Sequence, residues 1–334
     1  MNICYNPNDT YCQHTAVSLA SLLENNKTSE EINVYILCEN VSDENKEKFK
    51  QLTDNYSNTT LNIIDCSDLI DVSKHRFHTG AWKKSYNYLL YIYAGSLFPN
   101  IDKILWLDGD IIVTGSLEEL WNTDIENYVV GAALDCPPFM NFTPDEPFWT
   151  SPFYFNAGSL LINLKKFREL DIEKKCEQTI LCGKNPLRFL DQSIYNLSIK
   201  PELVKRLDLK YNFPTGISNA AFIGMTKINH KNKPTFTVEE YRKSSCERTI
   251  LHFIGGKQPE KPWFIESDAQ NKALYLKYLE FTPWKGTPLK SYYDCGGSKA
   301  MSIFSKGWDT AFSATLRKPF HNTILKNKVK KGIL

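Results

Sequence analysis

The segment from Lys103 to Leu107 constrains the fold more than any other part of the sequence. It contains four consecutive apolar residues, from Ile104 to Leu107, which leave no polar face for water. A strand that is apolar on both faces belongs in the middle of a sheet covered by helices on both sides, as in parallel α/β sheets. The strand runs directly into Asp108-Gly109-Asp110, so two carboxylates are predicted at the carboxyl end of a central strand.

The first hundred residues alternate between short β-rich segments and helical patterns. Strands are predicted at Asn2–Tyr5, Glu31–Cys38 and Leu61–Asp65, and a charged helix is predicted from its N-cap Ser42 to about Asn55. This alternation is typical of βαβ units. The chain is therefore predicted to be an α/β protein with a Rossmann-like, mostly parallel sheet flanked by helices, in which ligands bind beyond the carboxyl ends of the strands.

Length and charge limit the possible organisation and partners. At 334 residues the chain exceeds the usual size of one hydrophobic core, which predicts a main domain at 1–265 and a small helical, basic extension at 266–334. A net charge of +2, from 40 basic and 38 acidic residues, indicates no nucleic-acid partner. No apolar segment approaches the roughly 20 residues that cross a bilayer, and no signal peptide is recognisable, so a cytoplasmic location is expected.

The C-terminal residues 301–334 are strongly basic, with seven Lys or Arg residues against Asp309 alone. Apolar side chains such as Trp308, Phe312 and Leu316 are interleaved with these basic residues. A segment of this kind either lies on anionic lipid at the inner face of the plasma membrane or remains in solvent as a free C-terminus. Peripheral membrane contact is therefore one of two predictions for this segment.

Asp108 and Asp110 are the first candidate for a chemical site. Two carboxylates separated by one residue at a strand end can converge on a divalent cation, because the turn breaks the alternation that would point them apart. The alternative is a solvated acidic turn. Apolar segments flank the pair on both sides, with Ile111-Ile112-Val113 following, so unpaired carboxylates would be costly and a metal site is favoured.

A second polar cluster begins at His252. This residue follows Ile250-Leu251, which predicts another strand end, and an imidazole suits Mn²⁺ better than Mg²⁺ or Ca²⁺. Glycines beginning with Gly255 permit a close backbone approach to phosphate, and Lys257 and Lys261 supply positive charge. Taken alone, the histidine is an ordinary core or surface residue and each lysine an ordinary surface residue.

Five short motifs follow one another in a characteristic order. They are Asn8-Asp9-Thr10-Tyr11, Lys103–Asp110, Phe155–Leu164, Asp191-Gln192 and His252–Trp263. Together they resemble glycosyltransferase family 8 over residues 1–265, a family of retaining enzymes that includes glycogenin and the bacterial lipopolysaccharide galactosyl- and glucosyltransferases. The resemblance implies a glycosyltransferase type A fold.

The resemblance implies a metal site and a nucleotide site. Asp108, Asp110 and His252 would bind Mn²⁺, with Mg²⁺ as the alternative ion, and the ion would bridge the two phosphates of a UDP-sugar. The polar segment after the first strand would hold the uracil, and Tyr11 would offer a ring for stacking. The uracil-binding residues would be Asn8, Thr10 and Tyr11.

The resemblance also implies a sugar site. Asn156 and Asp191 would bind the sugar hydroxyls, Gln192 would lie beneath the anomeric carbon, and Asp135 would lie near the sugar or the acceptor. Gly255 and Lys261 would contact the diphosphate. The complete set of donor-binding residues implied in this way is Asn6, Asn8, Thr10, Tyr11, Asp108, Gly109, Asp110, Asp135, Asn156, Asp191, Gln192, Gly255, Lys257 and Lys261.

Two residues and the length of one segment depart from the family pattern. Tyr91 stands where many members have an arginine that contacts the donor, and Asn8 stands where an aspartate often reads the base. The segment after His252 is about two residues longer than the common form. Either Lys257 or Lys261 could therefore reach the phosphate, and the Lys-Pro-Trp sequence favours Lys261.

The implied reaction is the retaining transfer of glucose or galactose from a UDP-sugar to a glycan, a lipid-linked or a protein-linked acceptor. Retention usually involves a carboxylate nucleophile. The matching position is occupied by Gln192, whose amide oxygen is a poor nucleophile, so front-face attack is favoured and Asp191 is the rival nucleophile.

Other readings of the same residues are open. Asp108-Gly109-Asp110 after an apolar strand also resembles the entry to haloacid-dehalogenase-type phosphatases, and a catalytically silent sugar-nucleotide or glycan-binding protein is a further alternative. Phe155–Leu164 could be a buried strand with a glycine bulge. Asp191-Gln192 could be a helix N-terminus, and Asp135 a turn at a strand end.

Overall fold

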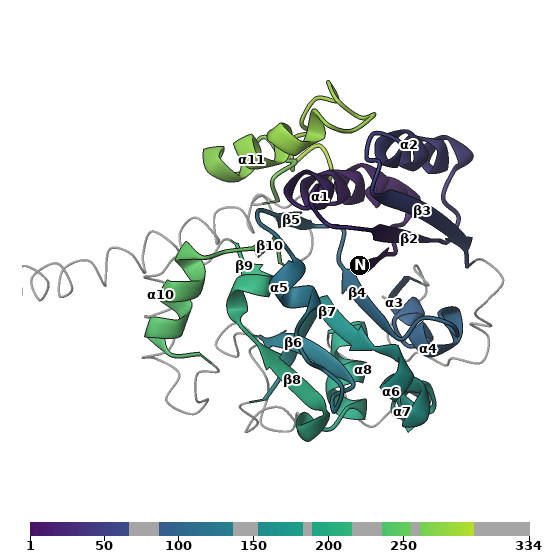
Figure 1. Cartoon of the computed structure of the whole chain (residues 1–334). Helices are drawn as coiled ribbons and strands as arrows, with labels where there is room; N and C mark the ends of the chain where they lie inside the picture. Colours follow the sequence, from purple (N-terminus) through teal and green to yellow (C-terminus); the bar gives the residue numbers. More distant parts are fainter. Residues whose placement is uncertain (67–86, 136–152, 183–188, 216–235, 255–260, 297–334) are drawn as a thin grey trace, which may run out of the picture.

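The computed structural model describes residues 1–66, 87–135, 153–182, 189–215, 236–254 and 261–296. In this part of the chain, helices cover both faces of a seven-stranded sheet, and a three-stranded sheet adjoins it (Figure 1). The predicted C-terminal segment 301–334 lies outside the described residues, as do Gly255 and Lys257.

One half of the large sheet is parallel. Strands β3 (Thr59–Asp65), β2 (Ile32–Cys38), β1 (Asn2–Tyr5) and β4 (Lys103–Leu107) lie side by side, and each pairs in parallel with the next. All four strands were predicted from the sequence, with boundaries within two residues. The central position predicted for β4 from its apolar residues is confirmed.

The other half of the sheet contains an antiparallel strand. Strand β7 (Phe155–Asn163) runs antiparallel to β4 on one side and to β6 (Val130–Leu134) on the other, and β8 (Val204–Leu207) pairs in parallel with β6. The resulting order is β3-β2-β1-β4-β7-β6-β8. The ends of β1, β4 and β6 and the start of β7 therefore meet at one edge of the sheet.

The second sheet was not predicted. It consists of β5 (Ile111–Val113), β10 (Ile250–His252) and β9 (Phe213–Pro214), in the order β5-β10-β9. Strand β10 runs antiparallel to β5 and pairs His252 with Ile111. This pairing brings His252 next to the turn that carries the two aspartates.

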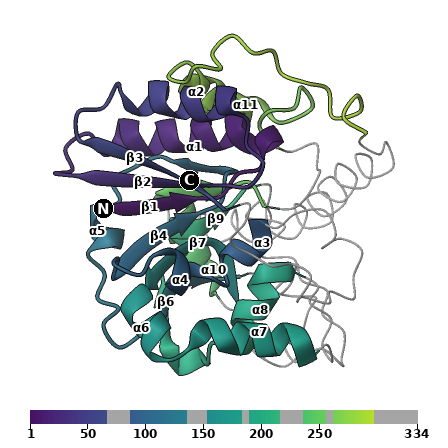
Figure 2. The same ribbon diagram turned by 90° about the vertical axis from the view of Figure 1, so that its right-hand side faces the viewer.

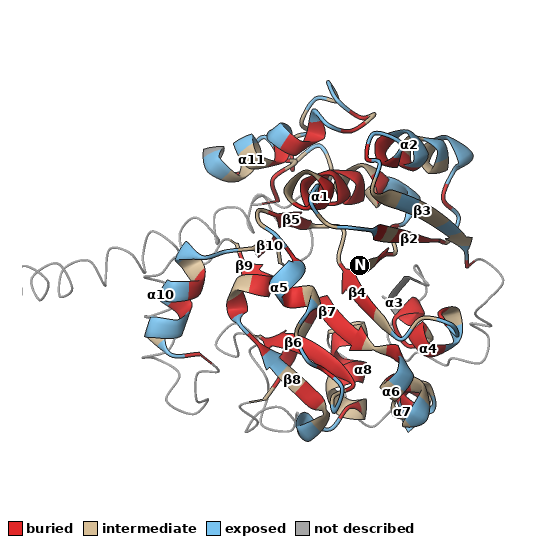
Figure 3. Ribbon diagram, in the orientation of Figure 1, coloured by how far each residue is buried: buried red, intermediate tan, exposed pale blue. Residues whose placement is uncertain are grey.

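The two faces of the large sheet bury separate apolar clusters. In β1, Ile3 and Tyr5 join one cluster and Cys4 joins the other, as the alternation of side chains along a strand requires. Figure 3 shows that the strands at the centre of the sheet are largely buried between the helical layers. Trp106 of β4 is the largest of the completely buried side chains among the described residues.

Helices α1 (Cys12–Asn25), α2 (Asp43–Thr53) and α11 (Ala269–Leu279) lie on one side of the sheet (Figure 2). Helix α2 is capped by Ser42 as predicted, since the Ser42 hydroxyl accepts a hydrogen bond from the Asn45 N–H at 3.3 Å. Tyr275 of α11 belongs to the same buried cluster as the apolar face of α1.

The opposite side is covered by α4 (Ala94–Leu97), α6 (Leu164–Glu169), α7 (Ile172–Cys182) and α8 (Leu190–Ser198) (Figure 2). Among the described residues, no helix combines the length and the apolar character needed to span a membrane. The remaining helical segments are α3 (Asn87–Leu90), α5 (Glu118–Trp121), α10 (Val238–Cys246) and short 3₁₀ turns at Asp9–Tyr11, Pro201–Leu203 and Leu209–Asn212.

Candidate metal and donor site

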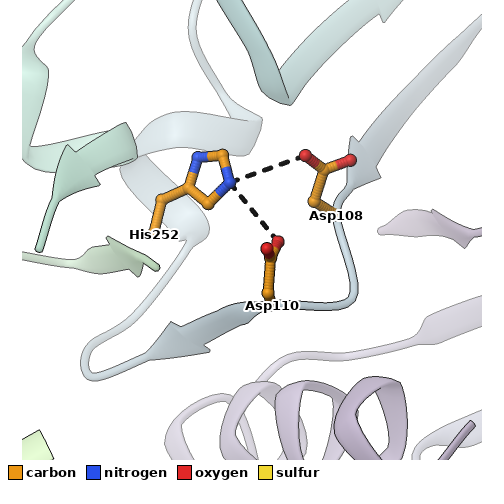
Figure 4. A group of neighbouring side chains, drawn as sticks. All are labelled: Asp108, Asp110 and His252. Carbon is orange, nitrogen blue, oxygen red and sulfur yellow. Dashed lines mark ion pairs between the residues drawn. The ribbon is translucent and has the colours of Figure 1, made fainter. Parts of the chain in front are cut away.

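Asp108, Asp110 and His252 converge at the carboxyl edge of the sheet (Figure 4). Asp108 follows β4, Asp110 precedes β5, and His252 ends β10. The His252 Nε2 atom lies 3.5 Å from Asp108 Oδ2 and 3.4 Å from Asp110 Oδ1. One ligand atom from each residue lies within 4.8 Å of the others.

The chemistry and spacing of this cluster fit a divalent cation. Two carboxylates and one imidazole are a donor set suited to Mn²⁺ and related ions. Ligand atoms about 2.1 Å from an octahedral ion lie about 3.0 Å apart when they are adjacent, so a small rotation of the present side chains closes them around one ion. The juxtaposition expected for these three residues is therefore present.

Lys261 adds a buried positive charge to the cluster. Its side chain is 2% exposed and donates hydrogen bonds to Asp110 Oδ2 and to the Phe253 carbonyl. A buried ammonium group in this place balances part of the negative charge of the aspartates. Of the two lysines considered from the sequence, Lys261 lies at the site, and Lys257 lies outside the described residues.

The three candidate ligands shift one another's pKa values. Burial raises the pKa of Asp108, and the charge of Asp110 raises it further. Burial alone would also raise the pKa of Asp110, but Lys261 and His252 outweigh it and hold that pKa below its usual range. Burial favours the neutral ring of His252, yet its interactions with Asp110 and then Asp108 raise its pKa. A cation entering the cluster would thus displace protons.

Two glycines allow side chains to pack closely against this site. A Cβ atom at Gly158 would lie 2.2 Å from His252 Cε1, 2.6 Å from His252 Nδ1 and 3.0 Å from Asp108 Oδ2. A Cβ atom at Gly109 would lie 2.3 Å from Thr15 Oγ1 and 3.3 Å from the Tyr11 ring. The second contact shows that the turn after β4 touches the segment predicted to bind the nucleotide.

Tyr91 reaches the site in a way that the sequence did not indicate. Its hydroxyl donates a 2.7 Å hydrogen bond to Asp108 Oδ1. Its ring stacks on Trp106 at 4.4 Å, and its carbonyl accepts a hydrogen bond from the Tyr195 hydroxyl. Tyr91, which stands where many family members have an arginine, therefore orients the candidate metal ligand Asp108.

The predicted nucleotide-binding residues follow β1 at the same edge. Asn6 accepts a 3.1 Å hydrogen bond from Trp106 Nε1. Asn8 caps the 3₁₀ turn and accepts hydrogen bonds from the Thr10 hydroxyl at 2.8 Å and the Tyr11 N–H at 3.1 Å. The Tyr11 ring meets the Trp263 ring edge to face at 5.6 Å.

The predicted sugar-binding residues form a hydrogen-bonded group beside the metal cluster. Asp135 Oδ2 accepts from Asn156 Nδ2 and from Gln192 Nε2, each at 3.0 Å. The Gln192 oxygen accepts from the Ala157 N–H at 3.1 Å. Asn156, Asp135 and Gln192 come from β7, the end of β6 and α8, so three elements supply this group.

Asp191 lies in the first turn of α8, after a strained residue. Burial and the charge of Asp108 raise its pKa well above the usual range. Leu190 has a φ of +51°, a left-handed conformation that is unfavourable for a leucine. Asp191 therefore lies at a helix N-terminus, as considered from the sequence, but the N-cap residue is Phe189. Asp191 is also close enough to Asp108 to interact with its charge.

Asn212 was not identified from the sequence. It is 4% exposed, lies directly before β9, and joins His252 to Asn156 through hydrogen bonds. A lone asparagine before a two-residue strand gives no signal, because its role depends on the pairing of β9 with β10.

The mostly parallel sheet flanked by helices is the type A fold of glycosyltransferases, and the solved structures with this fold include several glycosyltransferases. The galactosyltransferase LgtC in complex with donor and acceptor sugar analogues has a TM-score of 0.64 and 24% identity, over 85% of this chain and 96% of that chain. The glycosyltransferase GlyE of Streptococcus pneumoniae has a TM-score of 0.57 and 23% identity, over 92% of this chain and 64% of that chain.

The chain belongs to glycosyl transferase family 8, whose family model matches residues 2–266. A Haemophilus influenzae protein named as a glycosyltransferase is 33% identical over 219 residues, which are 64% of this chain and 63% of that protein. The match thus spans less than two thirds of that relative. Lipopolysaccharide 1,2-glucosyltransferase of Escherichia coli and lipopolysaccharide 1,3-galactosyltransferase of Salmonella typhimurium are each 24% identical, over 85% of this chain and 79% of each relative.

Proposed function

We propose that this protein transfers glucose or galactose from a UDP-sugar to a glycan, a lipid-linked or a protein-linked acceptor, with retention of configuration and with Mn²⁺ as cofactor. The observation that carries the proposal is the cluster of Asp108, Asp110 and His252 beside the hydrogen-bonded group of Asp135, Asn156 and Gln192. The names of the enterobacterial relatives support a hexose donor. Membership of the family disfavours the phosphatase alternative.

The metal and the lysine have distinct roles in this proposal. When bound by Asp108, Asp110 and His252, the ion supplies a Lewis acid that neutralises a diphosphate leaving group. Lys261 is already held at Asp110, so it can offer its charge to a phosphate oxygen without a large movement of the backbone. Gly255 and Lys257 are proposed as further phosphate contacts, although they lie outside the described residues.

The sugar would occupy the side of the site formed by Asp135, Asn156 and Gln192. We propose front-face attack, in which the Gln192 carbonyl oxygen steadies positive charge on the sugar. Burial raises the pKa of Asp191, which disfavours the carboxylate form that a nucleophile needs and so favours this choice. We propose that the uridine is held by Asn6, Asn8, Thr10 and Tyr11. This segment lies next to the turn after β4, because a Cβ atom at Gly109 would contact the Tyr11 ring.

The first experiment follows UDP release from a panel of UDP-sugars with Mn²⁺ and without an acceptor. Slow hydrolysis of one hexose donor is expected, and the Asp110→Asn variant should lose it. Asp102→Asn is the matched control, because Asp102 lies before the opposite end of β4 and is exposed. Mg²⁺-dependent hydrolysis of p-nitrophenyl phosphate without UDP release would favour the phosphatase instead. UDP-sugar binding in calorimetry without turnover on any acceptor or water would favour the silent binding protein.

A second experiment separates the two mechanisms. Gln192→Ala is expected to retain partial activity and UDP-sugar binding, since the metal cluster is left intact. Mass spectrometry of the variant during turnover would detect a glycosyl group on Asp191 if that residue were the nucleophile. An inactive variant carrying this adduct would replace front-face attack with a two-step mechanism.

We also propose that residues 266–334 form an extension that supports acceptor or membrane contact at the cytoplasmic face. The basic composition of 301–334 is the reason for this proposal. Truncation near Gly307 should reduce sedimentation with anionic liposomes at low salt, and unchanged sedimentation would refute the membrane contact.

A further inference from the structure

The ring of His252 can serve as a metal ligand only in one orientation and tautomer. Its Nε2 atom faces the two aspartates, so the lone pair for a cation must be on Nε2 and the proton of the neutral ring on Nδ1. Ligating histidines usually donate their other N–H to a protein acceptor that fixes the ring. The group in that place is Asn212, whose Oδ1 lies 2.9 Å from His252 Nδ1.

Hydrogen bonds around Asn156 determine which atom of Asn212 faces the histidine. The Gly158 N–H can only donate, and it lies 2.9 Å from Asn156 Oδ1. The ionised Asp135 carboxylate can only accept, and it lies 3.0 Å from Asn156 Nδ2. These two contacts fix the amide of Asn156. Its Oδ1 then accepts from Asn212 Nδ2 at 2.8 Å, which leaves Asn212 Oδ1 for the histidine.

The same hydrogen bonds continue to the sugar side of the site. Asp135 Oδ2 accepts from Gln192 as well as from Asn156. A continuous series of hydrogen bonds therefore runs from His252 through Asn212, Asn156 and Asp135 to Gln192. His252 and Asn212 are 5% and 4% exposed, so water does not compete freely for these contacts.

We propose that Asn212 is a positioning residue that holds His252 with its proton on Nδ1, and that it ties the metal ligand to the sugar-binding group through Asn156. The first half concerns only the metal cluster, and the second half rests on the proposed function. The glycine at position 158 contributes by leaving room for the ring beside β7. No substrate needs to contact Asn212 for either half to hold.

Metal binding tests the first half. Asn212→Leu keeps the size of the side chain but removes the acceptor, and it should weaken Mn²⁺ binding about 10- to 100-fold in an EPR titration. Asn212→Asp restores the acceptor for His252 Nδ1 but cannot donate to Asn156 Oδ1, so it should recover part of this affinity. Asn26→Leu is the matched control, because Asn26 is also buried and its side-chain amide bonds only backbone groups of Leu22 and Leu117. Equal Mn²⁺ affinity in wild type and a folded Asn212→Leu variant would overturn the proposal.

The tautomer itself can be read by NMR in wild-type protein, so the test does not depend on whether a variant folds. The chain has six histidines, and His252→Gln assigns the relevant signals in ¹⁵N-histidine-labelled protein. At a pH above the pKa of His252, Nδ1 should carry the proton of the neutral ring without metal, and it should keep this proton with the diamagnetic ion Cd²⁺. A ring with a bare Nδ1 in either state would contradict the proposal. Neither measurement uses a UDP-sugar, so failure of the proposed function would leave this result intact.

The link to the sugar site is tested by kinetics once a donor is known. Asn156→Ser shortens the side chain that connects Asn212 to Asp135, and it should lower kcat more than Mn²⁺ affinity. The opposite result is that Asn156→Ser loses as much Mn²⁺ affinity as Asn212→Leu but keeps the wild-type kcat at saturating metal. This result would show that Asn156 only supports Asn212, and it would remove the second half of the proposal.

Discussion

Replacing Gly158 with alanine is the sharpest test of how the metal cluster is built. The new Cβ atom would lie 2.2 Å from His252 Cε1 and 2.6 Å from His252 Nδ1. Carbon atoms in contact keep about 3.5 Å between them, so the ring has to move by about 1.3 Å. Asn212 holds the ring from Nδ1, and Asp108 Oδ2 would itself lie 3.0 Å from the new methyl group, so the ring has little room to retreat.

A shift of this size is large for a metal site. Ligand distances are normally held within about 0.2 Å, and a misplacement of about 1 Å near reacting groups can cost about 100-fold in rate. We therefore expect Gly158→Ala to weaken Mn²⁺ binding by about 100-fold, which corresponds to about 2.8 kcal/mol. Overpacking of this kind also lowers the free energy of unfolding by about 1–3 kcal/mol.

The assay combines an EPR titration with Mn²⁺ and urea unfolding of the metal-free protein. Gly131→Ala is the matched control, because Gly131 is a buried strand glycine of β6 whose new Cβ would meet Leu207 only at 3.4 Å, an ordinary contact. Gly131→Ala should bind Mn²⁺ like wild type. If Gly158→Ala did so too, His252 would not be a ligand in the position described, and the reasoning from this contact would be refuted.

Three further predictions concern neighbours of the cluster. Tyr91→Phe keeps the ring on Trp106 but removes the hydrogen bond to Asp108, so Mn²⁺ affinity should fall about tenfold in the same titration while thermal stability changes little; unchanged affinity would exclude an orienting role. Mn²⁺ affinity should fall on acidification by up to about tenfold per pH unit for each proton displaced, because the raised pKa values of His252 and Asp108 make protons compete with the ion; a flat profile from pH 8 to 6 would contradict this. The pKa of His14 is lowered to about 3 by burial, so the folded state binds fewer protons than the unfolded state, and stability is lost as pH falls from about 6.5 towards 3. His14→Phe keeps a ring that can stack on Trp263. Between pH 7 and pH 5, the free energy of unfolding in urea should fall by about 2 kcal/mol less for this variant than for wild type. An equal fall in both proteins would mean that His14 does not titrate in this way.

The large sheet could be predicted because its strands carry their own signal. Ile104 to Leu107 are apolar at every position, and Asn2–Tyr5 and Ile32–Cys38 stand between turn residues and amphipathic helices. Such patterns depend only on neighbours in the sequence. The buried strand considered as one alternative for Phe155–Leu164 is observed as β7, but its antiparallel direction was not predicted, since a buried strand has the same pattern in either orientation.

The second sheet could not be predicted, because its strands are two or three residues long and pair across long stretches of sequence. His252 was nevertheless identified as a ligand candidate, from its place after an apolar pair and from the family pattern. Asn212 was missed because its importance comes only from lying next to His252 in space. Tyr91 was predicted to depart from the family pattern, but its contact with Asp108 depends on the folded arrangement of residues 17 positions apart and leaves no signal in the sequence.

The register of this small sheet connects the packing of the core to the chemistry of the site. Ile250 belongs to the buried cluster on the α1 side of the large sheet, and Leu251 belongs to the cluster on the other side. Side chains alternate along a strand, so these two preferences favour the observed register of β10 against β5 over a slip of one residue. In that register His252 pairs with Ile111 and faces the turn of Asp108 and Asp110. A slip of one residue would bury His252 on the wrong face, and it would cost both apolar contacts at once. The hydrophobic pattern that stabilises β10 therefore also brings His252 to the two aspartates, and Asn212 then fixes the orientation of its ring.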